Sequence, residues 1–234
     1  MTTVYRSTAL LLLIAGSLMS QGPINTIPSW DGIRFVTGFG GGASNTATYG
    51  QTITVAPGSA VVSSFGFEMG VCDATVTFRG EIYAWDGAKA TGPSLFESPV
   101  ATLDSSDSFQ LVTFNTGALT LPPGAYVIFA TTSRDQVTAS QCEWGSLQSG
   151  TAAYPAGRHV FMNNGAIPSQ WTTVAWGTEP FDLAFEVNME PAPPPPTPTG
   201  VSGVPAASPA TLLLGFAGVI ALGLLGLSRL RMAR

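Results

Sequence analysis

The last part of the chain constrains the fold most strongly, because it contains an uncharged apolar run long enough to cross a membrane. No charged residue occurs from Ala210 to Leu227, and Thr211 is the only polar residue in the run. As an α-helix this run would be about 27 Å long, close to the thickness of the hydrocarbon core. A single segment pairs all its backbone groups in lipid only as a helix. The sequence therefore predicts a transmembrane helix over 210–227, with a buried helix of a soluble domain as the alternative.

Basic residues follow this run and a proline-rich segment precedes it. Arg229, Arg231 and Arg234 come directly after the apolar residues, so they predict a stop-transfer signal with the C-terminus in the cytoplasm. Residues 191–203 read PAPPPPTPTGVSG, which is typical of a semi-rigid polyproline linker with a reach of at most about 40 Å. We therefore expect a linker over 191–203 and a membrane-directed tail over 204–234.

The first twenty residues have the pattern of a secretory signal peptide. Arg6 supplies a positive charge, Ala9 to Ala15 form a short apolar stretch, and small residues follow at Gly16, Ser17 and Ser20. The apolar stretch is too short for a membrane span. The sequence therefore predicts a signal peptide over 1–20, cleaved after Ser17 or Ser20, and one exported domain over 21–190.

Charge is distributed unevenly along the chain. All fourteen acidic residues lie between Asp31 and Glu190, where only five basic residues occur, so this part has a net charge of −9. The whole chain has a net charge of −5. A nucleic-acid partner requires a basic face, and we therefore expect none. An acidic domain outside the cytoplasm fits this distribution.

Short segments rich in β-branched and aromatic residues alternate with turn signals throughout the expected domain. The turn signals are Pro57-Gly58, Asp86-Gly87, Pro122-Pro123-Gly124 and Asn164-Gly165. No window has a sustained helical period. The pattern predicts an all-β fold, a single β-sandwich of jelly-roll type. The expected strands are 51–55, 61–69, 75–85, 109–114, 125–131, 160–162, 171–176 and 181–187.

The chain has two cysteines, Cys72 and Cys142. In an exported protein such a pair predicts a disulfide, which would stabilise the fold by about 4 kcal/mol in the chain-entropy model. Two buried thiols are the alternative. Two cysteines without paired spacing do not make a zinc site.

Catalytic motifs and cofactor motifs are lacking, so we expect a protein that is not an enzyme, without cofactor or catalytic residues. The single histidine, His159, is interpreted as a solvent-facing or strand-edge residue. Two carboxylate pairs, Glu81 with Asp86 and Asp104 with Asp107, leave a glycosidase as an alternative. No metal site is predicted, but Asp104 and Asp107 are a candidate calcium pair, with a solvated loop as the other interpretation.

Two aromatic residues indicate an alternative function, the binding of a glycan. Trp144 and Tyr154 lie in a segment rich in Gly, Ser and Gln, and we expect them to be exposed, whereas Trp85 ends a strand and is expected to pack. Flat rings bind the apolar faces of sugars. Jelly rolls often carry such sites, which is an argument from fold alone.

The end of the chain resembles a known class of bacterial sorting signal. The residues VPAASP at 204–209, the apolar run, and Ser228-Arg229-Leu230-Arg231 are similar to the PEP-CTERM class, and most similar to its IPTL-CTERM variant. The motif residues would be Val204, Pro205, Ser208 and Pro209. The glutamate found between the prolines of the commonest form is missing, which affects which sorting enzyme would recognise the tail.

The resemblance implies a partner and a location. An exosortase-type membrane transpeptidase would recognise the tail, cut near the motif and release the protein. The protein would be anchored in the inner membrane until then, and afterwards would belong to the cell surface or extracellular matrix, where exopolysaccharide is a further expected partner.

The domain itself resembles a recurrent uncharacterised family of exported bacterial β-sandwiches. The residues that carry this resemblance are 76–132, 161–165 and 181–185. It implies fold and location, and no activity. We therefore expect an exported, non-enzymatic surface or matrix protein, with a glycan-binding module and, after it, a glycosidase as the alternatives.

Overall fold

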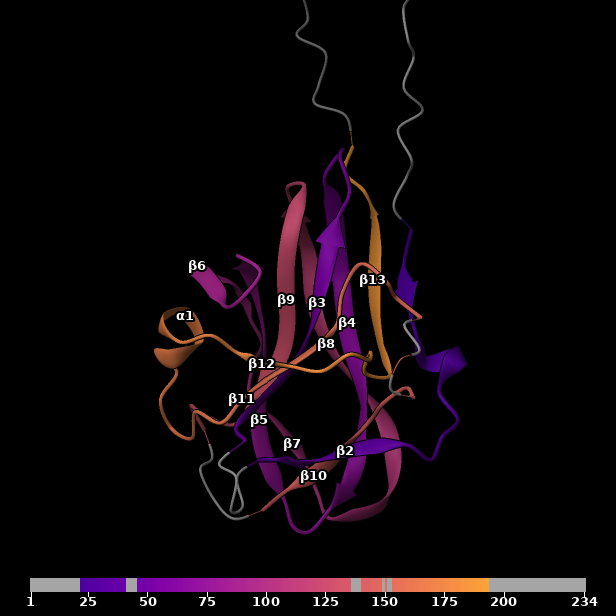
Figure 1. The fold of residues 1–234 in the computed structure, drawn as a ribbon, viewed down its shortest axis with the longest axis vertical. Helices are drawn as coiled ribbons and strands as arrows, with labels where there is room; N and C mark the ends of the chain where they lie inside the picture. Colours follow the sequence, from indigo (N-terminus) through magenta and orange to yellow (C-terminus); the bar gives the residue numbers. More distant parts are fainter. Residues whose placement is uncertain (1–21, 41–45, 136–139, 149, 151–152, 194–234) are drawn as a thin grey trace, which may run out of the picture. The chain divides into compact units, whose positions relative to one another are not determined.

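The computed structural model describes residues 22–40, 46–135, 140–148, 150 and 153–193, and these residues form two antiparallel β-sheets packed face to face (Figure 1). The predicted all-β sandwich is confirmed. The first sheet contains β1 (Ile24–Asn25), β2 (Phe35–Phe39), β4 (Ala60–Cys72), β8 (Ser106–Leu121), β10 (Cys142–Gly145) and β13 (Phe185–Pro191). The second contains β3 (Thr48–Val55), β5 (Val76–Trp85), β6 (Ala90–Glu97), β7 (Ala101–Leu103), β9 (Gly124–Thr131), β11 (His159–Met162) and β12 (Gly177–Thr178).

The chain crosses between the two sheets several times, as from β3 to β4, from β4 to β5 and from β8 to β9. The first sheet has the order β1-β13-β4-β10-β2, with β8 on the other edge of β4. The second has the order β12-β11-β3-β9-β5-β6, with β7 also on β5. Several neighbours within a sheet are therefore distant in sequence: Ile24 of β1 lies opposite Val187 of β13.

Strand β4 is the centre of the first sheet because it has three partners. On one edge it pairs with β8 from Ala60 to Cys72. On the other edge it pairs first with β13, from Ala60 to Phe67, and then with β10 at Met69 and Gly70. The strand predicted over 61–69 is therefore part of the central strand β4.

The core between the sheets is mostly aromatic. Both sheets contribute rings that are fully buried, among them Phe39, Phe65 and Phe67 from the first sheet and Phe78 from the second. Gly80 faces this core, and a Cβ there would lie 2.4 Å from the ring of Phe114, so the close approach requires glycine at this position. Burial of such rings is the main stabilising contribution to this fold.

A second apolar cluster lies on the outer face of the second sheet. The short helix α1 (Gln170–Thr173) brings Trp171 against Phe129, with ring centroids 5.2 Å apart, and Trp176 packs on the same ring. The predicted strand over 171–176 is wrong. Pro168 begins a turn in which its carbonyl accepts a hydrogen bond from Trp171 N, and both tryptophans then reach the sheet from outside it.

The expected strand over 181–187 begins later than predicted. Residues 181–184 approach β13 as a connecting segment with one isolated bridge, Ser146 to Leu183, and the strand itself runs from Phe185 to Pro191. The first residue assigned to the linker is therefore the last residue of β13. Beside the sheets lies one 3-10 turn, η1 (Ile27–Ser29).

The membrane-directed segments expected at the two ends lie outside the described residues. These are the signal peptide over 1–20 and the tail over 204–234, with its span over 210–227 and most of the linker. Within the part of the chain that the structure describes, no helix is long and apolar enough to cross a membrane. All described strands belong to one compact unit that ends at Pro193.

Candidate ligand-binding groove

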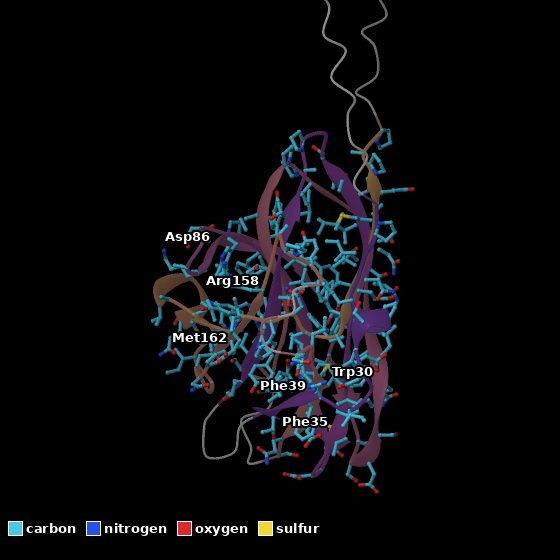
Figure 2. All side chains as sticks on the ribbon, turned by 45° about the vertical axis from the view of Figure 1, so that its right-hand side comes forward. Trp30, Phe35, Phe39, Asp86, Arg158 and Met162 are labelled. Atoms are coloured by element: carbon cyan, nitrogen blue, oxygen red, sulfur yellow. A yellow bond between two sulfur atoms is a disulfide. The ribbon has the colours of Figure 1, made fainter. Side chains whose placement is uncertain are left out.

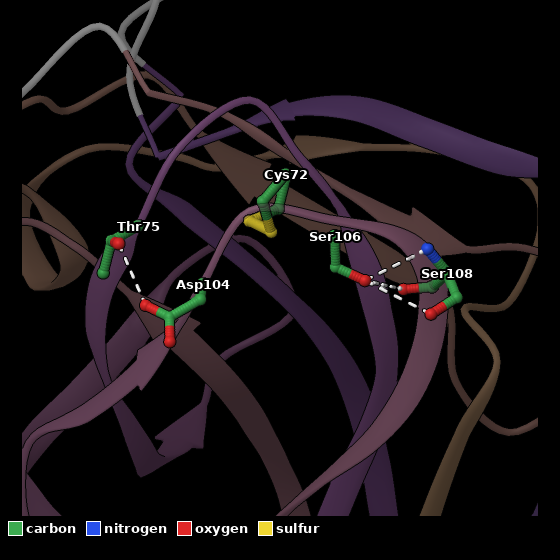
Figure 3. The surroundings of a disulfide bond; sticks show 6 residues. Cys72, Thr75, Asp104, Ser106 and Ser108 are labelled. Carbon is green, nitrogen blue, oxygen red and sulfur yellow. Dashed lines mark hydrogen bonds between the residues drawn. A yellow bond between two sulfur atoms is a disulfide. The ribbon is translucent and has the colours of Figure 1, made fainter.

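The predicted disulfide is confirmed. Cys72 at the end of β4 and Cys142 at the start of β10 are joined, with their Cα atoms 4.1 Å apart (Figure 3). Both side chains are buried, and neither cysteine of the chain is free. The bond joins two neighbouring strands of the first sheet across a sequence separation of 70 residues.

The candidate calcium pair does not form a set of ligands in the described structure. Asp104 accepts a hydrogen bond of 2.9 Å from the hydroxyl of Thr75 (Figure 3). Asp107 lies with Asp73 beside a shallow pocket that Asp104 does not line. Among the described residues, no three His, Cys, Asp or Glu side chains gather closely enough to hold a metal ion.

Glu81 and Asp86, the other carboxylate pair, are each held in a local structural interaction. Glu81 is fully buried and accepts hydrogen bonds from Arg134 and Ser94, and its burial raises its pKa. Asp86 accepts hydrogen bonds from Lys89 and from the backbone of its own turn, which lower its pKa to about 2. Both carboxylates therefore take part in local structural interactions.

Arg134 connects the buried Glu81 to the outer cluster of the second sheet. Its guanidinium lies 5.2 Å from the ring centroid of Trp171 and 3.6 Å from the carboxylate of Glu97, which is opposite Glu81 on the neighbouring strand. A buried charge requires such a partner, because an unpaired carboxylate in this position would be strongly destabilising. The network therefore secures the sheet face that α1 covers.

The expected exposed position of Trp144 is wrong. Its side chain is fully buried, with ring centroids 4.7 Å from Phe67, 4.9 Å from Phe39 and 5.6 Å from Tyr49. The polar residues around Trp144 in sequence do not predict a core strand. The strand lies in the sheet because β10 pairs with both β4 and β2. Trp144 therefore belongs to the core and presents no surface to a sugar.

Tyr154, the other expected glycan-binding residue, is half-buried, and a hydrogen bond of its hydroxyl holds the side chain in place. That hydroxyl accepts a hydrogen bond of 2.9 Å from Thr54 N, and the ring packs on Phe185 at 6.1 Å. Its backbone N–H donates to the buried carboxylate of Asp182, which Gln51 also binds. Tyr154 therefore connects its loop to the sandwich, and it does not lie beside Trp144 on a common surface.

His159 occupies a different environment from the one expected. Only 2% of the residue is exposed, and its ring lies against Tyr49, Phe161 and Phe181 at centroid distances of 5.2, 5.9 and 5.4 Å. Neither ring nitrogen has a hydrogen-bond partner among the described residues. Burial lowers the pKa of His159 to about 3, so the ring is neutral at physiological pH.

A groove opens over this histidine, and we call it the aromatic groove. It has a volume of about 540 Å³ and takes residues from β2 of the first sheet and from β3 and β11 of the second. In Figure 2, Phe35 and Phe39 mark the two ends of β2, and Met162 marks the end of β11. The groove is lined by Phe35, Val36, Thr37, Thr46, Tyr49, His159, Phe161, Asn163, Glu179 and Phe181.

Polar groups of the groove are arranged around Tyr49. The Tyr49 hydroxyl donates to the carbonyl of Thr37 at 2.6 Å, and burial, together with the nearby charge of Glu179, raises its pKa to about 12. Asn163 accepts a hydrogen bond from the Thr46 hydroxyl at 2.7 Å through its amide oxygen, which leaves its amide nitrogen as a donor. The groove thus combines aromatic walls with a carboxylate, an amide and a neutral imidazole.

The sequence contains one signal for this groove. His159 and Phe161 are two residues apart on one strand, so their side chains share a face of the sheet. Long-range pairing brings other residues to the groove, namely Phe35 from β2 and Glu179 and Phe181, which follow β12. This pairing has no signature in the sequence.

Comparisons with known proteins give a distant likeness of fold. No protein-family model matches the chain, and no curated protein matches it. A solved structure of the clostridial cysteine protease Cwp84 after propeptide cleavage is similar with a TM-score of 0.45 at 9% identity, covering 69% of this chain and 38% of that chain.

A second structure contains the cysteine protease and lectin-like domains of Cwp84, a surface layer associated protein of Clostridium difficile. It is similar with a TM-score of 0.42 at 10% identity, covering 63% of this chain and 33% of that one. The chain therefore spans about a third of the length of these structures. Likeness at this level assigns no family and no activity to the chain.

Proposed function

We propose that this chain is an exported, non-enzymatic protein of the cell surface or extracellular matrix, carrying an exosortase-type sorting tail. The observation that carries the proposal is the disulfide between Cys72 and Cys142, because disulfides persist in oxidising compartments outside the cytoplasm. The signal peptide expected over 1–20 and the tail expected over 204–234 supply the route to such a compartment. The acidic charge of the domain supports a role without nucleic acid.

We infer further that the sandwich is wound as a jelly roll. The order β1-β13-β4-β8 in one sheet, opposite β3-β9-β5-β6 in the other, fits two Greek keys. In this arrangement the carboxylates of Glu81, Asp86 and Asp182 serve structural interactions. Both cysteines are bonded to each other, so neither is available as a nucleophile. These features favour a structural or binding role.

The route that we propose has two stages. The apolar run over 210–227 first anchors the protein in the inner membrane, with Arg229, Arg231 and Arg234 on the cytoplasmic side. An exosortase-like transpeptidase then cuts near the motif of Val204, Pro205, Ser208 and Pro209. The domain is afterwards part of the cell surface or the matrix.

Fractionation of native cells with intact-mass analysis tests this route. We expect a product that begins near Gln21, ends between Val204 and Pro209, contains the disulfide and occurs outside the inner membrane. The double variant Pro205→Ala/Pro209→Ala should accumulate unprocessed, whereas Pro195→Ala in the linker should be processed normally. Full-length protein that stays in the inner membrane would show the tail to be a permanent anchor. Cytoplasmic protein with reduced cysteines would refute export.

A second function, the binding of a matrix polysaccharide, is favoured by one specific observation. Trp144 and Tyr154 do not supply its surface, but the aromatic groove offers rings and polar groups together in a volume suited to a small ligand. On this proposal the exported domain would hold exopolysaccharide without altering it.

A further inference from the structure

The aromatic groove has one feature that points to a ligand rather than to packing alone. His159 lines the groove, is 2% exposed, and has no partner for either ring nitrogen among the described residues. Buried polar atoms are nearly always hydrogen-bonded, so each exception requires an explanation. The groove volume of about 540 Å³ lies within the range of small-ligand sites.

We infer that the aromatic groove binds neutral pyranose units of a polysaccharide. This inference rests on the second proposed function, and it specifies the site and the ligand class. It replaces the site expected from the sequence, because Trp144 is buried in the core and Tyr154 is bound to Thr54.

The walls of the groove fit the apolar face of a sugar ring. Phe35 is 48% exposed, and Phe161 and Phe181 are half-buried, so all three offer ring surface to a ligand. Tyr49 stands deeper, at 85° to the ring of Phe161. A pyranose can stack its C–H groups on the exposed rings, which is favourable because the ring faces are electron-rich.

Polar groups in the groove fit a ligand with several hydroxyl groups. Glu179 offers a carboxylate that accepts hydrogen bonds, and Asn163 offers an amide nitrogen that donates them. Hydrogen bonds to a carboxylate are the stronger kind. A quaternary ammonium ion would use the rings and the carboxylate, but it has no hydroxyl for Asn163.

The charge of the groove selects against acidic sugars. Among the described residues that line the groove there is neither lysine nor arginine, and Glu179 is the one charged side chain. A uronic acid would place a second carboxylate near Glu179 without a cation to compensate for it. The net charge of −9 between Asp31 and Glu190 acts in the same direction.

Calorimetric titration of the exported protein, purified from native cells, tests this inference. The probes are hexasaccharides of neutral glucan, mannan and galactan, with oligogalacturonate and choline as comparison ligands. We expect at least one neutral hexasaccharide to bind. Phe35→Ala should weaken that binding about tenfold by removing a stacking surface, and Glu179→Gln should weaken it about tenfold by removing the charged acceptor. Val100→Ala is the matched control, because Val100 is 47% exposed and does not line the groove.

Both groove variants should retain the thermal midpoint of the parent protein, because they change exposed or half-buried side chains. Absence of binding to every neutral hexasaccharide, or stronger binding of oligogalacturonate or choline, would overturn the inference. Binding that Phe35→Ala and Glu179→Gln leave unchanged would also overturn it, while the second proposed function would stand. Export and tail processing are measured separately by mass, so failure of the groove and failure of the sorting route are distinguishable.

Discussion

His159 is held as a neutral ring because Tyr49, Phe161 and Phe181 surround its imidazole. A charged imidazolium in this position would have no counterion within the ring cluster and would lose its hydration. The folded state therefore binds a proton on His159 only near pH 3, whereas the unfolded chain does so near the ordinary value of 6.5.

The pH dependence of stability should reflect this difference. The pKa of His159 is lowered in the folded state. The contribution of its neutral ring to the free energy of unfolding is therefore complete above about pH 6.5 and is lost as the pH falls toward about 3. The expected loss is about 1.4 kcal/mol for each pH unit within this window. His159→Phe keeps an aromatic ring and removes the titration. The free energy of unfolding, measured with urea between about pH 7 and about pH 4, should therefore depend less steeply on pH in the variant.

Other groups titrate in the same range and are shared by the parent and the variant. Burial raises the pKa of Glu81 and of Asp182, so their contributions are lost as the pH rises, opposite to that of His159. The difference between the two proteins isolates the histidine. Equal losses of unfolding free energy in both proteins would contradict the assigned environment.

At the scale of elements, the disulfide secures a strand that has few residues of its own. β10 has four residues and lies between β4 and β2, where it carries the buried Trp144. The bond from Cys142 to Cys72 keeps its first residue beside β4. Loss of this cross-link should therefore raise the conformational entropy of the unfolded chain and also loosen the position of β10 beside β4.

Removal of the disulfide should lower stability substantially. For a sequence separation of 70 residues, the chain-entropy model gives a loss of about 4 kcal/mol for Cys72→Ala/Cys142→Ala. Urea unfolding with and without a thiol reductant measures this loss. The reductant should destabilise the parent by a similar amount and should leave the double variant unchanged. A parent protein that is indifferent to reductant would contradict the expectation.

Elements with strong local signals were predictable from sequence. The segments 51–55, 61–69, 75–85 and 125–131 all lie within or nearly within β3, β4, β5 and β9, because central strands are rich in buried β-branched and aromatic residues. β2, β6 and β10 were missed because glycine and polar residues interrupt them and only their partners make them strands. The aromatic groove was missed for the same reason, since β2 and β11 belong to different sheets.

At the scale of the whole domain, the first and last strands complete the same sheet. β13 pairs with both β1 and β4, and its Phe185, Val187 and Met189 are buried in the core. A chain that lacks β13 leaves these positions empty and exposes one edge of β4. The cooperative unit therefore requires the residues up to Pro191.

A pair of truncations tests this requirement. Residues 22–193, produced under oxidising conditions, should unfold in one cooperative transition, because they include every described strand. Residues 22–184 should show no such transition, because β13 is missing. Far-UV circular dichroism during urea unfolding distinguishes the two. A cooperative transition of equal midpoint in the shorter chain would show that β13 is dispensable.

The pairing of β1 with β13 also determines when β1 can pair during synthesis of the chain. Thr26, directly after β1, exchanges hydrogen bonds with Phe185, and these two residues are 159 positions apart in the chain. At a synthesis rate of about 5–20 residues per second, the first strand waits roughly 10–30 s for its partner. Throughout that delay β1 has no partner strand, so the first sheet cannot be completed. The winding of the sandwich thus postpones completion of the first sheet until the last strand has been made.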